Sequence, residues 1–310
     1  MSSNRKATRS NREHETIAFI ATKPLQILIA TAIKSQMSPE KNFVLAVVDG
    51  FSSSKIVADN ISESELGWKS VIWAKSKEKL LPAIKDVAPD KVFVDSDVGI
   101  RNLIYLIKLK LRTNLTSMFV YEEGVGTYRS DLYLGVKRMV LQALGVGVNF
   151  GGSAIVDGIY LYDPKNYAAL SGKISKSIIP IEKNVASIVA TDPLIWANLF
   201  EAGFFVDSLK SKSTVCHIYM SSWNVDERAI AFVSSKSGDK YMKLHPHLKS
   251  SDFRDLDEGV RVVPSQMPAE LVLGLLASIY EKVFVYHHGS SVIRYVNEAD
   301  VIIFYLLRRL

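Results

Sequence analysis

The sequence predicts an α/β protein with two tandem domains, each built around a parallel sheet, and three observations support this. Short apolar runs rich in β-branched and aromatic residues alternate with longer amphipathic segments, as strands alternate with crossover helices in such sheets. The alternation is interrupted near residues 185–212 and then restarts. Polar residues follow the apolar runs in both halves. Because open α/β sheets bind ligands beyond the carboxyl ends of their strands, we expect a ligand cleft between the two domains.

The composition suits a globular protein. The chain has 310 residues, of which 48% are hydrophobic, and this is enough to bury a sizeable core. No window of about 18 consecutive apolar residues predicts a transmembrane helix, and the polar N-terminus predicts no secretory signal. Cys216 is the only cysteine, which excludes an internal disulfide and a Cys-rich zinc site and fits a reducing cytoplasm.

The net charge of the chain is +6, and its basic residues are dispersed along the sequence. We find no nucleic-acid recognition motif among them, and we therefore expect no nucleic-acid partner. A solvated surface, an anionic membrane face and an anionic substrate remain open as explanations of the charge.

Residues 1–15 are predicted to be a disordered basic arm, because they contain almost no apolar residues. The first domain is predicted to cover residues 16–185. In its first helix, Thr22 is the expected N-cap and Pro24 lies near the first turn. The predicted strands cover residues 16–21, 43–48, 70–74, 91–94, 118–121, 159–162 and 177–181. Another predicted helix ends near residue 87, and two more cover residues 100–111 and 132–144.

The second domain is predicted to cover residues 186–310. It opens with a helix over residues 194–202, for which Asp192 is the expected N-cap. The predicted strands cover residues 215–220, 240–244, 260–263, 283–286 and 301–305. The predicted helices cover residues 225–234, 269–280 and a segment that ends near residue 297.

A pair of carboxylates ends the strand at residues 118–121. The strand runs directly into Glu122-Glu123-Gly124, and the glycine permits a sharp turn. A Glu held at such a strand end is placed for acid–base chemistry, although one Glu could equally cap the next helix while the other is solvated. A second acid-acid-Gly tripeptide, Asp257-Glu258-Gly259, precedes a strand instead of ending one, and we interpret it as a solvated turn.

Asp95 and Asp97 follow the strand at residues 91–94. We interpret them mainly as turn formers or helix caps, and contact with a substrate is the alternative. Asp95-Ser96-Asp97 has the letters of a metal-binding Asp-x-Asp motif, and it lies in the N-terminal half of the chain.

Three further features in the second half could bind a nucleotide. Ser290 and Ser291 follow a strand and open a helix, where they could bind a phosphate or simply cap the helix. His245 is restricted by Pro246, so its imidazole could be aimed at a phosphate or could have a structural role. Glu270 lies in the first turn of a helix, where it could accept hydrogen bonds from ribose hydroxyls or interact with the helix dipole.

In this order and at these strand ends, Glu122-Glu123-Gly124, His245-Pro246 and Ser290-Ser291 resemble the acid-acid-Gly, His-Pro and Ser-Ser motifs of bacterial sialyltransferases. The resemblance is to the lipooligosaccharide sialyltransferase and capsular polysialyltransferase group, and it spans about residues 16–306. Two further segments support it. Thr22-Lys23-Pro24-Leu25-Gln26 is similar to the Thr-Pro-Leu-Gln-like start of several members, with Lys23 interrupting the usual Thr-Pro, and Pro268-Ala269-Glu270 lies where the family has a ribose-binding Glu.

The resemblance implies a GT-B fold, with two Rossmann-like domains that face a central cleft. It also implies an inverting sialyltransferase that transfers sialic acid from CMP-sialic acid to a terminal galactose or sialic acid of a lipooligosaccharide or capsule. Glu123 would be the general base, supported by Glu122 and Gly124. The residues implied to hold the CMP-sugar, in the C-terminal domain, are His245, Pro246, Glu270, Ser290 and Ser291. Thr22 and Gln26 would lie on the acceptor side, in the N-terminal domain.

The implied donor leaves with a single phosphate, which His245 and two serine hydroxyls could stabilise, so we expect neither a metal nor another cofactor. His245 is then implied to be catalytic as well as donor-binding. The implied location is the cytoplasm of a bacterium, and peripheral contact with the inner membrane and homodimer formation remain open.

Other functions also remain open on the sequence alone. A GT-B glycosyltransferase could use a different sugar nucleotide. A metal-dependent hydrolase could use carboxylates together with His245, His247, His287 and His288. A catalytically silent module could bind CMP without turnover.

Overall fold

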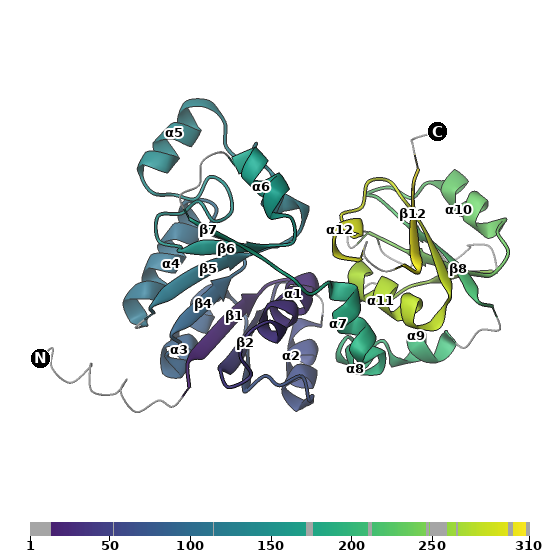
Figure 1. The fold of residues 1–310 in the computed structure, drawn as a ribbon, viewed down its shortest axis with the longest axis horizontal. Helices are drawn as coiled ribbons and strands as arrows, with labels where there is room; N and C mark the ends of the chain where they lie inside the picture. The colour runs from purple at the N-terminus through teal and green to yellow at the C-terminus, as the bar shows by residue number, and fades with distance from the viewer. Residues whose placement is uncertain are drawn as a thin grey trace, which may run out of the picture. The chain divides into compact units, whose positions relative to one another are not determined.

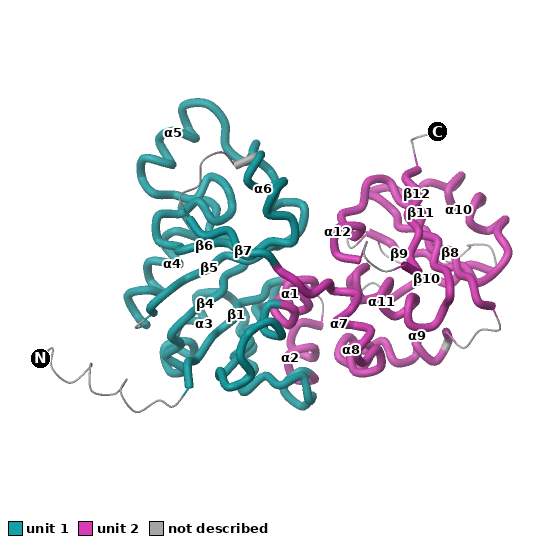
Figure 2. The backbone as a smooth tube through the Cα atoms, viewed as in Figure 1, with its two compact units in different colours: residues 1–22, 33–50, 61–180 teal, residues 23–32, 51–60, 181–310 magenta. Residues whose placement is uncertain are grey.

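The structure is a computed structural model, which describes residues 14–51, 53–113, 115–171, 176–209, 213–245, 248, 259–264, 266–296 and 300–307. The chain divides into two compact units (Figure 2). Unit 1 contains residues 1–22, 33–50 and 61–180, and unit 2 contains residues 23–32, 51–60 and 181–310. The predicted boundary after residue 185 stays a prediction.

Unit 1 is built on a seven-stranded sheet with the order β3-β2-β1-β4-β5-β6-β7 (Figure 1), and its paired strands are all parallel. The strands are β1 (Thr16–Ala21), β2 (Asn42–Val48), β3 (Ser70–Ala74), β4 (Lys91–Val94), β5 (Ser117–Tyr121), β6 (Gly158–Leu161) and β7 (Ser177–Pro180). The helices of this half of the chain are α1 (Pro24–Ser35), α2 (Ser54–Glu63), α3 (Lys77–Val87), α4 (Ile100–Arg112), the 3₁₀ helix η1 (Val125–Tyr128), α5 (Gly135–Ala143) and α6 (Pro164–Ser171).

The central strands of unit 1 are continuous apolar runs because both faces of the sheet are buried. Every residue of β1 is buried. On one face, Ala18 and Val120 belong to the main hydrophobic cluster of the unit. On the other, the ring of Phe19 stacks on Phe93 at 4.5 Å between centroids, and Phe93 stacks in turn on Phe119 at 5.3 Å. Alternate residues of each strand therefore fill two different cores.

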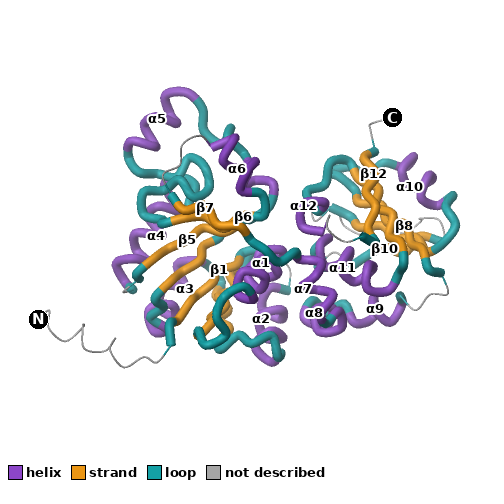
Figure 3. Tube along the Cα trace, viewed as in Figure 1, coloured by secondary structure: helices purple, strands orange, loops and turns teal. Residues whose placement is uncertain are grey.

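Unit 2 contains a smaller sheet of five parallel strands with the order β10-β9-β8-β11-β12. The strands are β8 (Val215–Met220), β9 (Asp239–Lys243), β10 (Val260–Val262), β11 (Lys282–His287) and β12 (Ile302–Leu306). The helices are α7 (Val185–Thr191), α8 (Pro193–Leu199), α9 (Gly203–Ser208), α10 (Glu227–Ser234), α11 (Ala269–Ile279) and α12 (Ile293–Val296), and Figure 3 shows strands and helices in separate colours. Helix α11 packs closely on α7, because a Cβ atom on Gly274 would lie 2.8 Å from the side chain of Val189.

Both sheets have a topological switch point next to their first strand. Strand β1 lies between β2 and β4, and strand β8 lies between β9 and β11. In each sheet the chain therefore first builds outward on one side and then returns to build on the other. The crevice beyond the carboxyl ends of the strands at such a point is the usual ligand site of an open α/β sheet.

The predicted fold class, α/β with two parallel Rossmann-like sheets, is confirmed. Each predicted strand is present to within two residues at either end, whereas helices α2, α6, α7, α9 and η1 were not predicted. Lys23 directly precedes α1, and the Thr22 hydroxyl donates to Asp95 Oδ2 at 2.9 Å, so the N-cap role of Thr22 stays a prediction. Most of the predicted basic arm lies outside the described residues. Among the described residues, no helix is long and apolar enough to span a membrane.

Candidate functional site

The carboxylate of Glu122 is fixed inside unit 1 at the carboxyl end of β5. Glu122 is fully buried, and its Oε2 accepts a hydrogen bond from Tyr128 Oη at 2.5 Å and one from the Tyr162 backbone N–H at 2.8 Å. Its own backbone N–H donates to Tyr160 O at 3.0 Å. Tyr128 lies in η1, and Tyr160 and Tyr162 lie in or just after β6. Glu122 therefore joins the ends of β5 and β6 to the turn that follows.

The neighbouring Glu123 is only half-buried. Its backbone N–H donates to Thr127 Oγ1 at 2.9 Å, which closes the turn that begins at Gly124. Gly124 has a φ of 128°, a backbone conformation that other residues rarely adopt, so the turn requires glycine there. Gly126 lies against the carboxylate, because an added Cβ would be 2.9 Å from Glu123 Oε1. The two carboxylates thus have different roles in the structure, and only Glu123 reaches the surface.

A three-residue polar network occupies the switch point of the first sheet. Asp95, directly after β4, is buried and accepts from Thr22 Oγ1 at 2.9 Å and from Lys77 Nζ at 2.6 Å. Thr22 follows β1, and Lys77 is the first residue of α3. Gln26 is fully buried, and its Oε1 accepts from the Lys23 N–H at 3.0 Å, which fixes the first turn of α1.

Asp97 holds the glycine-rich loop at residues 145–152 of unit 1. It is fully buried, and its two oxygens accept from the backbone N–H groups of Gly151 and Ser153 at 2.8 and 2.7 Å. Burial raises the pKa of Asp97 to about 6, while the two amide hydrogen bonds and Lys176 oppose that rise. These contacts agree with the prediction that Asp97 is a turn former.

In unit 2, His245 lies two residues beyond the end of β9 and stacks on an exposed tryptophan. The imidazole ring and the Trp223 ring are 4.6 Å apart at an interplanar angle of 29°. The His245 backbone N–H donates to Ser221 Oγ at 2.8 Å. Ser221 and Trp223 both lie in the loop after β8, so that loop sets the position of the imidazole. Trp223 was not singled out from the sequence, although a tryptophan three residues after a predicted strand is a usable signal.

Lys243 and Glu270 form a buried pair of ionisable groups. Lys243 ends β9, Glu270 lies in the first turn of α11, and both are buried. Burial raises the pKa of Glu270 to about 7, and the Lys243 charge opposes this. Burial likewise lowers the pKa of Lys243 to about 8, against the attraction of Glu270. The Lys243 ammonium donates to Leu244 O at 3.1 Å, and its role was not predicted from the sequence.

The loop after β11 is organised by His287. The Nδ1 atom of this buried imidazole accepts from the backbone N–H groups of Gly289 and Ser290 at 3.1 and 2.9 Å. Burial, and next the neighbouring His288, lowers the pKa of His287, which favours the neutral ring that can accept these bonds. Ser290 Oγ accepts from the Val292 N–H at 3.3 Å, and both serines are partly exposed. The described part of the helix that follows, α12, is only four residues long.

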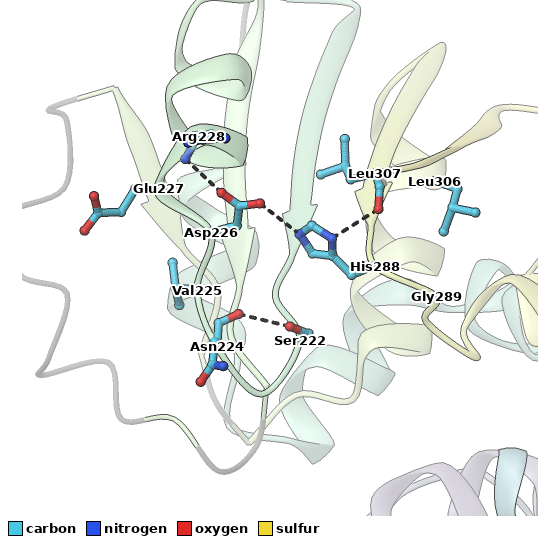
Figure 4. A pocket seen from close by; sticks show the side chains of 10 residues that line it. All are labelled: Ser222, Asn224, Val225, Asp226, Glu227, Arg228, His288, Gly289, Leu306 and Leu307. Atoms are coloured by element: carbon cyan, nitrogen blue, oxygen red, sulfur yellow. Dashed lines mark hydrogen bonds and ion pairs between the residues drawn. The ribbon is translucent and has the colours of Figure 1, made fainter. Parts of the chain in front are cut away.

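A cavity of about 670 Å³ lies beyond the carboxyl ends of β8, β11 and β12 (Figure 4), and therefore includes the switch point of the second sheet. In its wall, His288 Nδ1 donates to Leu307 O at 3.2 Å, and His288 Nε2 lies 3.7 Å from Asp226 Oδ2. Asp226 also caps α10 by accepting from the Arg228 N–H at 3.0 Å. Gly289 lines the cavity next to Ser290 in the chain, so the cavity borders the Ser290–Ser291 loop.

The predicted site residues fall into separate groups. Glu122, Glu123 and Gly124 share one strand end of unit 1. His245 and Glu270 belong to unit 2, as do Ser290 and Ser291, and all follow carboxyl ends of its sheet or begin α11. Pro246, His247 and Asp257-Glu258 lie outside the described residues. Among the described residues, no three His, Cys, Asp or Glu side chains are grouped as metal ligands.

Comparison with known proteins shows the fold and no family. No protein-family model matches the sequence, and no curated protein matches it either. The structure is similar to a UDP-N-acetylglucosamine 2-epimerase, with a TM-score of 0.52 and 12% identity over 96% of this chain and 80% of the epimerase. It is also similar to the wall teichoic acid polymerase TagF, with a TM-score of 0.50 and 12% identity over 90% of this chain and 67% of TagF. The fold class is therefore that of the two-domain, Rossmann-like GT-B proteins.

Proposed function

We propose that the protein is an inverting glycosyltransferase that transfers sialic acid from CMP-sialic acid to a terminal galactose or sialic acid of a bacterial surface glycan. The observation that carries this proposal is the division of roles in the Glu pair at the end of β5. Glu122 is buried and bonded, whereas Glu123 is partly exposed beside Gly124 and Gly126. The order of the acid-acid-Gly, His-Pro and Ser-Ser motifs on a GT-B fold supports the choice of donor.

Glu123 acts as the general base in this proposal. Its carboxylate takes the proton of the acceptor hydroxyl as the hydroxyl oxygen attacks C2 of the sialic acid. The bond between C2 and the phosphate oxygen breaks, and its electron pair leaves with CMP. Attack from the face opposite the leaving group inverts the configuration at C2. Glu122 holds the end of β5 and the following turn in place and takes no proton.

The donor binds to unit 2 in this proposal. Glu270 accepts hydrogen bonds from the ribose hydroxyls, and His245, Ser290 and Ser291 donate to the phosphate. His245 also protonates the departing phosphate, and its stacking on Trp223 holds the ring for that task. Pro246 would further restrict the backbone conformation of His245. Gln26 and Thr22 are retained as acceptor-side residues, although in the structure both side chains make bonds within the protein.

No divalent cation is needed in this proposal, because the leaving group carries one phosphate and three donors are assigned to it. Turnover in excess chelator should equal turnover without it. A loss of activity that only an added metal restores would contradict this part of the proposal. We further propose that the enzyme works in the cytoplasm.

A second candidate is a GT-B glycosyltransferase that uses a UDP-sugar. It is favoured by the similarity to a protein whose name contains UDP-N-acetylglucosamine, though at 12% identity this likeness concerns the fold. Slow hydrolysis of the donor without an acceptor separates the candidates. We expect release of CMP from CMP-sialic acid and no comparable release of nucleotide from UDP- or GDP-sugars. Hydrolysis of a UDP-sugar alone would favour the second candidate.

A further inference from the structure

Helix α4 is apolar on two opposite faces, and only one of them is covered. Tyr105, Leu106 and Leu109 pack into the main hydrophobic cluster of unit 1. On the other side of the helix four large aliphatic side chains are exposed, and the most exposed is Leu111 at 80%. They are spaced by four, three and four residues, which at 3.6 residues per turn places them in one stripe. The stripe consists of Ile100, Ile104, Ile107 and Leu111.

Helix α5 repeats this arrangement. Its single buried residue, Leu141, packs with Leu103 of α4 in a small cluster, so the two helices are joined. The opposite side of α5 exposes Val136 at 76% and Met139 at 69%, and it also exposes Val140. Isolated exposed aliphatic residues need no explanation, but two joined helices that both expose an apolar stripe do. We call the exposed apolar stripes of α4 and α5, with the charged residues beside them, the α4–α5 face.

The charged residues of both helices are all positive. Glu78 of the neighbouring α3 lies near Lys108, and Arg138 of α5 lies on the Leu141 side, where it is partly buried and donates to Ser130 O at 2.9 Å. Neither helix contains an acidic residue. On α4 the helical positions place basic residues on both sides of the stripe, because residues 101, 108 and 112 lie on one side and residue 110 on the other. The basic residues of the two helices are Arg101, Lys108, Lys110, Arg112, Lys137 and Arg138. By contrast, α3 carries Glu78 and Asp86, and α2 carries Asp59 and Glu63.

We propose that the α4–α5 face binds an anionic lipid bilayer. An apolar stripe with flanking lysines and arginines fits the boundary between acyl chains and phosphate headgroups, where the aliphatic side chains are buried and the cations meet anions. A second copy of the chain is a poorer occupant, because a symmetric contact through this face would place its basic residues against the same basic residues. The inference does not depend on which reaction the protein catalyses.

The test is co-sedimentation of the full-length chain with vesicles of phosphatidylcholine alone and of phosphatidylcholine mixed with phosphatidylglycerol. We expect binding to the mixed vesicles, weakened by added salt, and little binding to phosphatidylcholine alone. Ile104→Glu combined with Leu111→Glu should weaken binding by at least about tenfold, since it places charge at the apolar boundary. Lys108→Gln, Lys110→Gln and Arg112→Gln keep the stripe and should each weaken binding by about fivefold.

The matched control is Leu194→Glu combined with Phe204→Glu, which changes two well-exposed apolar residues of α8 and α9 in unit 2. It should bind mixed vesicles as the wild type does. Failure of the wild type to bind mixed vesicles, or equal loss in the α4 variant and the control, would overturn the proposal. A wild-type dimer that Ile104→Glu dissociates, without vesicle binding, would instead assign the face to a second copy.

Discussion

The carboxyl ends of the strands carry buried polar side chains in both sheets, but these side chains are satisfied in different ways. In unit 1 each buried carboxylate accepts hydrogen bonds from within the unit. Glu122 accepts from Tyr128 and from the Tyr162 amide. Asp97 accepts from two loop amides, and Asp95 accepts from Thr22 and Lys77. In unit 2 the buried carboxylate of Glu270 accepts a hydrogen bond from its own backbone N–H and is attracted by the Lys243 charge, and burial raises its pKa to about 7. A cavity of about 670 Å³ also lies beyond the carboxyl ends of three strands of the second sheet.

The difference separates two kinds of site. The first strand ends are preorganised by their own hydrogen bonds, which leaves Glu123 as the partly exposed carboxylate of its pair. At the second strand ends, burial shifts the pKa values of Lys243 and of the nearby Glu270 toward their neutral forms, so both groups titrate near neutral pH. This comparison predicts that changes at the Glu pair of unit 1 act on turnover or stability, whereas changes at Glu270, Ser290 and Ser291 in unit 2 act on nucleotide binding.

The largest expected effect is on turnover in Glu123→Gln. The substitution keeps the shape of the side chain and removes the base, so kcat should fall by about 10²–10⁴-fold. Tm and CMP affinity should hardly change. Glu122→Gln should instead lower the free energy of unfolding by about 1–3 kcal/mol, because its buried hydrogen bonds are disturbed.

The control for this pair is Asp257→Asn, in the other acid-acid-Gly tripeptide, which should keep kcat within about twofold. Wild-type turnover in Glu123→Gln, together with inactivity of folded Glu122→Gln, would reverse the assignment of the two carboxylates.

The strands could be predicted from the sequence, whereas this difference between the carboxylates could not. Apolar runs of four to seven residues report burial on both faces directly, as β1 and β2 show. Glu122 and Glu123 are adjacent and chemically identical, and what distinguishes them is a hydroxyl from Tyr128 and an amide from Tyr162. The second of these lies beyond a helix and a glycine-rich loop, so only tertiary structure brings it to Glu122. The short helices α7 and α9 also escaped prediction, since six or seven residues give too little periodicity.

A smaller loss of turnover is expected for Gly126→Ala. The new methyl group would lie 2.9 Å from Glu123 Oε1, so the carboxylate must move. Displacement of a catalytic group by about 1 Å can cost up to about 10²-fold in rate. We expect a lower kcat with unchanged CMP affinity in steady-state kinetics and calorimetry. Unchanged kcat would show that the position of the Glu123 carboxylate is not critical.

In unit 2, replacing both Ser290 and Ser291 by Ala should weaken CMP binding by about 1–3 kcal/mol, the scale of lost hydrogen bonds to a charged group. Isothermal calorimetry measures this directly. Ser208→Ala, outside the Ser290–Ser291 loop, serves as a control and should bind as the wild type does. If the double variant bound CMP with wild-type affinity, this would contradict the proposal that the Ser290–Ser291 loop binds the phosphate.

The pH dependence of CMP binding tests the Glu270–Lys243 pair. Glu270 accepts ribose hydrogen bonds best when ionised, so CMP affinity should rise as the pH increases through about 7. Because this pKa is raised from its ordinary 4.5, the stability that Glu270 contributes is present below pH 4.5 and is lost as the pH rises through about 7. In Lys243→Met the pKa of Glu270 should rise further, which would move the midpoint of the binding curve upward. A midpoint that stays in place would show that Lys243 does not act on Glu270.

The central claim is transfer of sialic acid with Glu123 as the base, and product analysis tests it most directly. Wild type and Glu123→Gln are incubated with CMP-sialic acid and a panel of labelled galactosides and oligosialic acids, and the products are separated and weighed by mass spectrometry. The account predicts that wild type adds one or more sialic acids to at least one acceptor, while Glu123→Gln, with normal CMP affinity, adds almost none. Transfer by both proteins at the same rate would contradict the role of Glu123. Absence of any sialylated product, together with transfer from a UDP-sugar, would contradict the proposed donor.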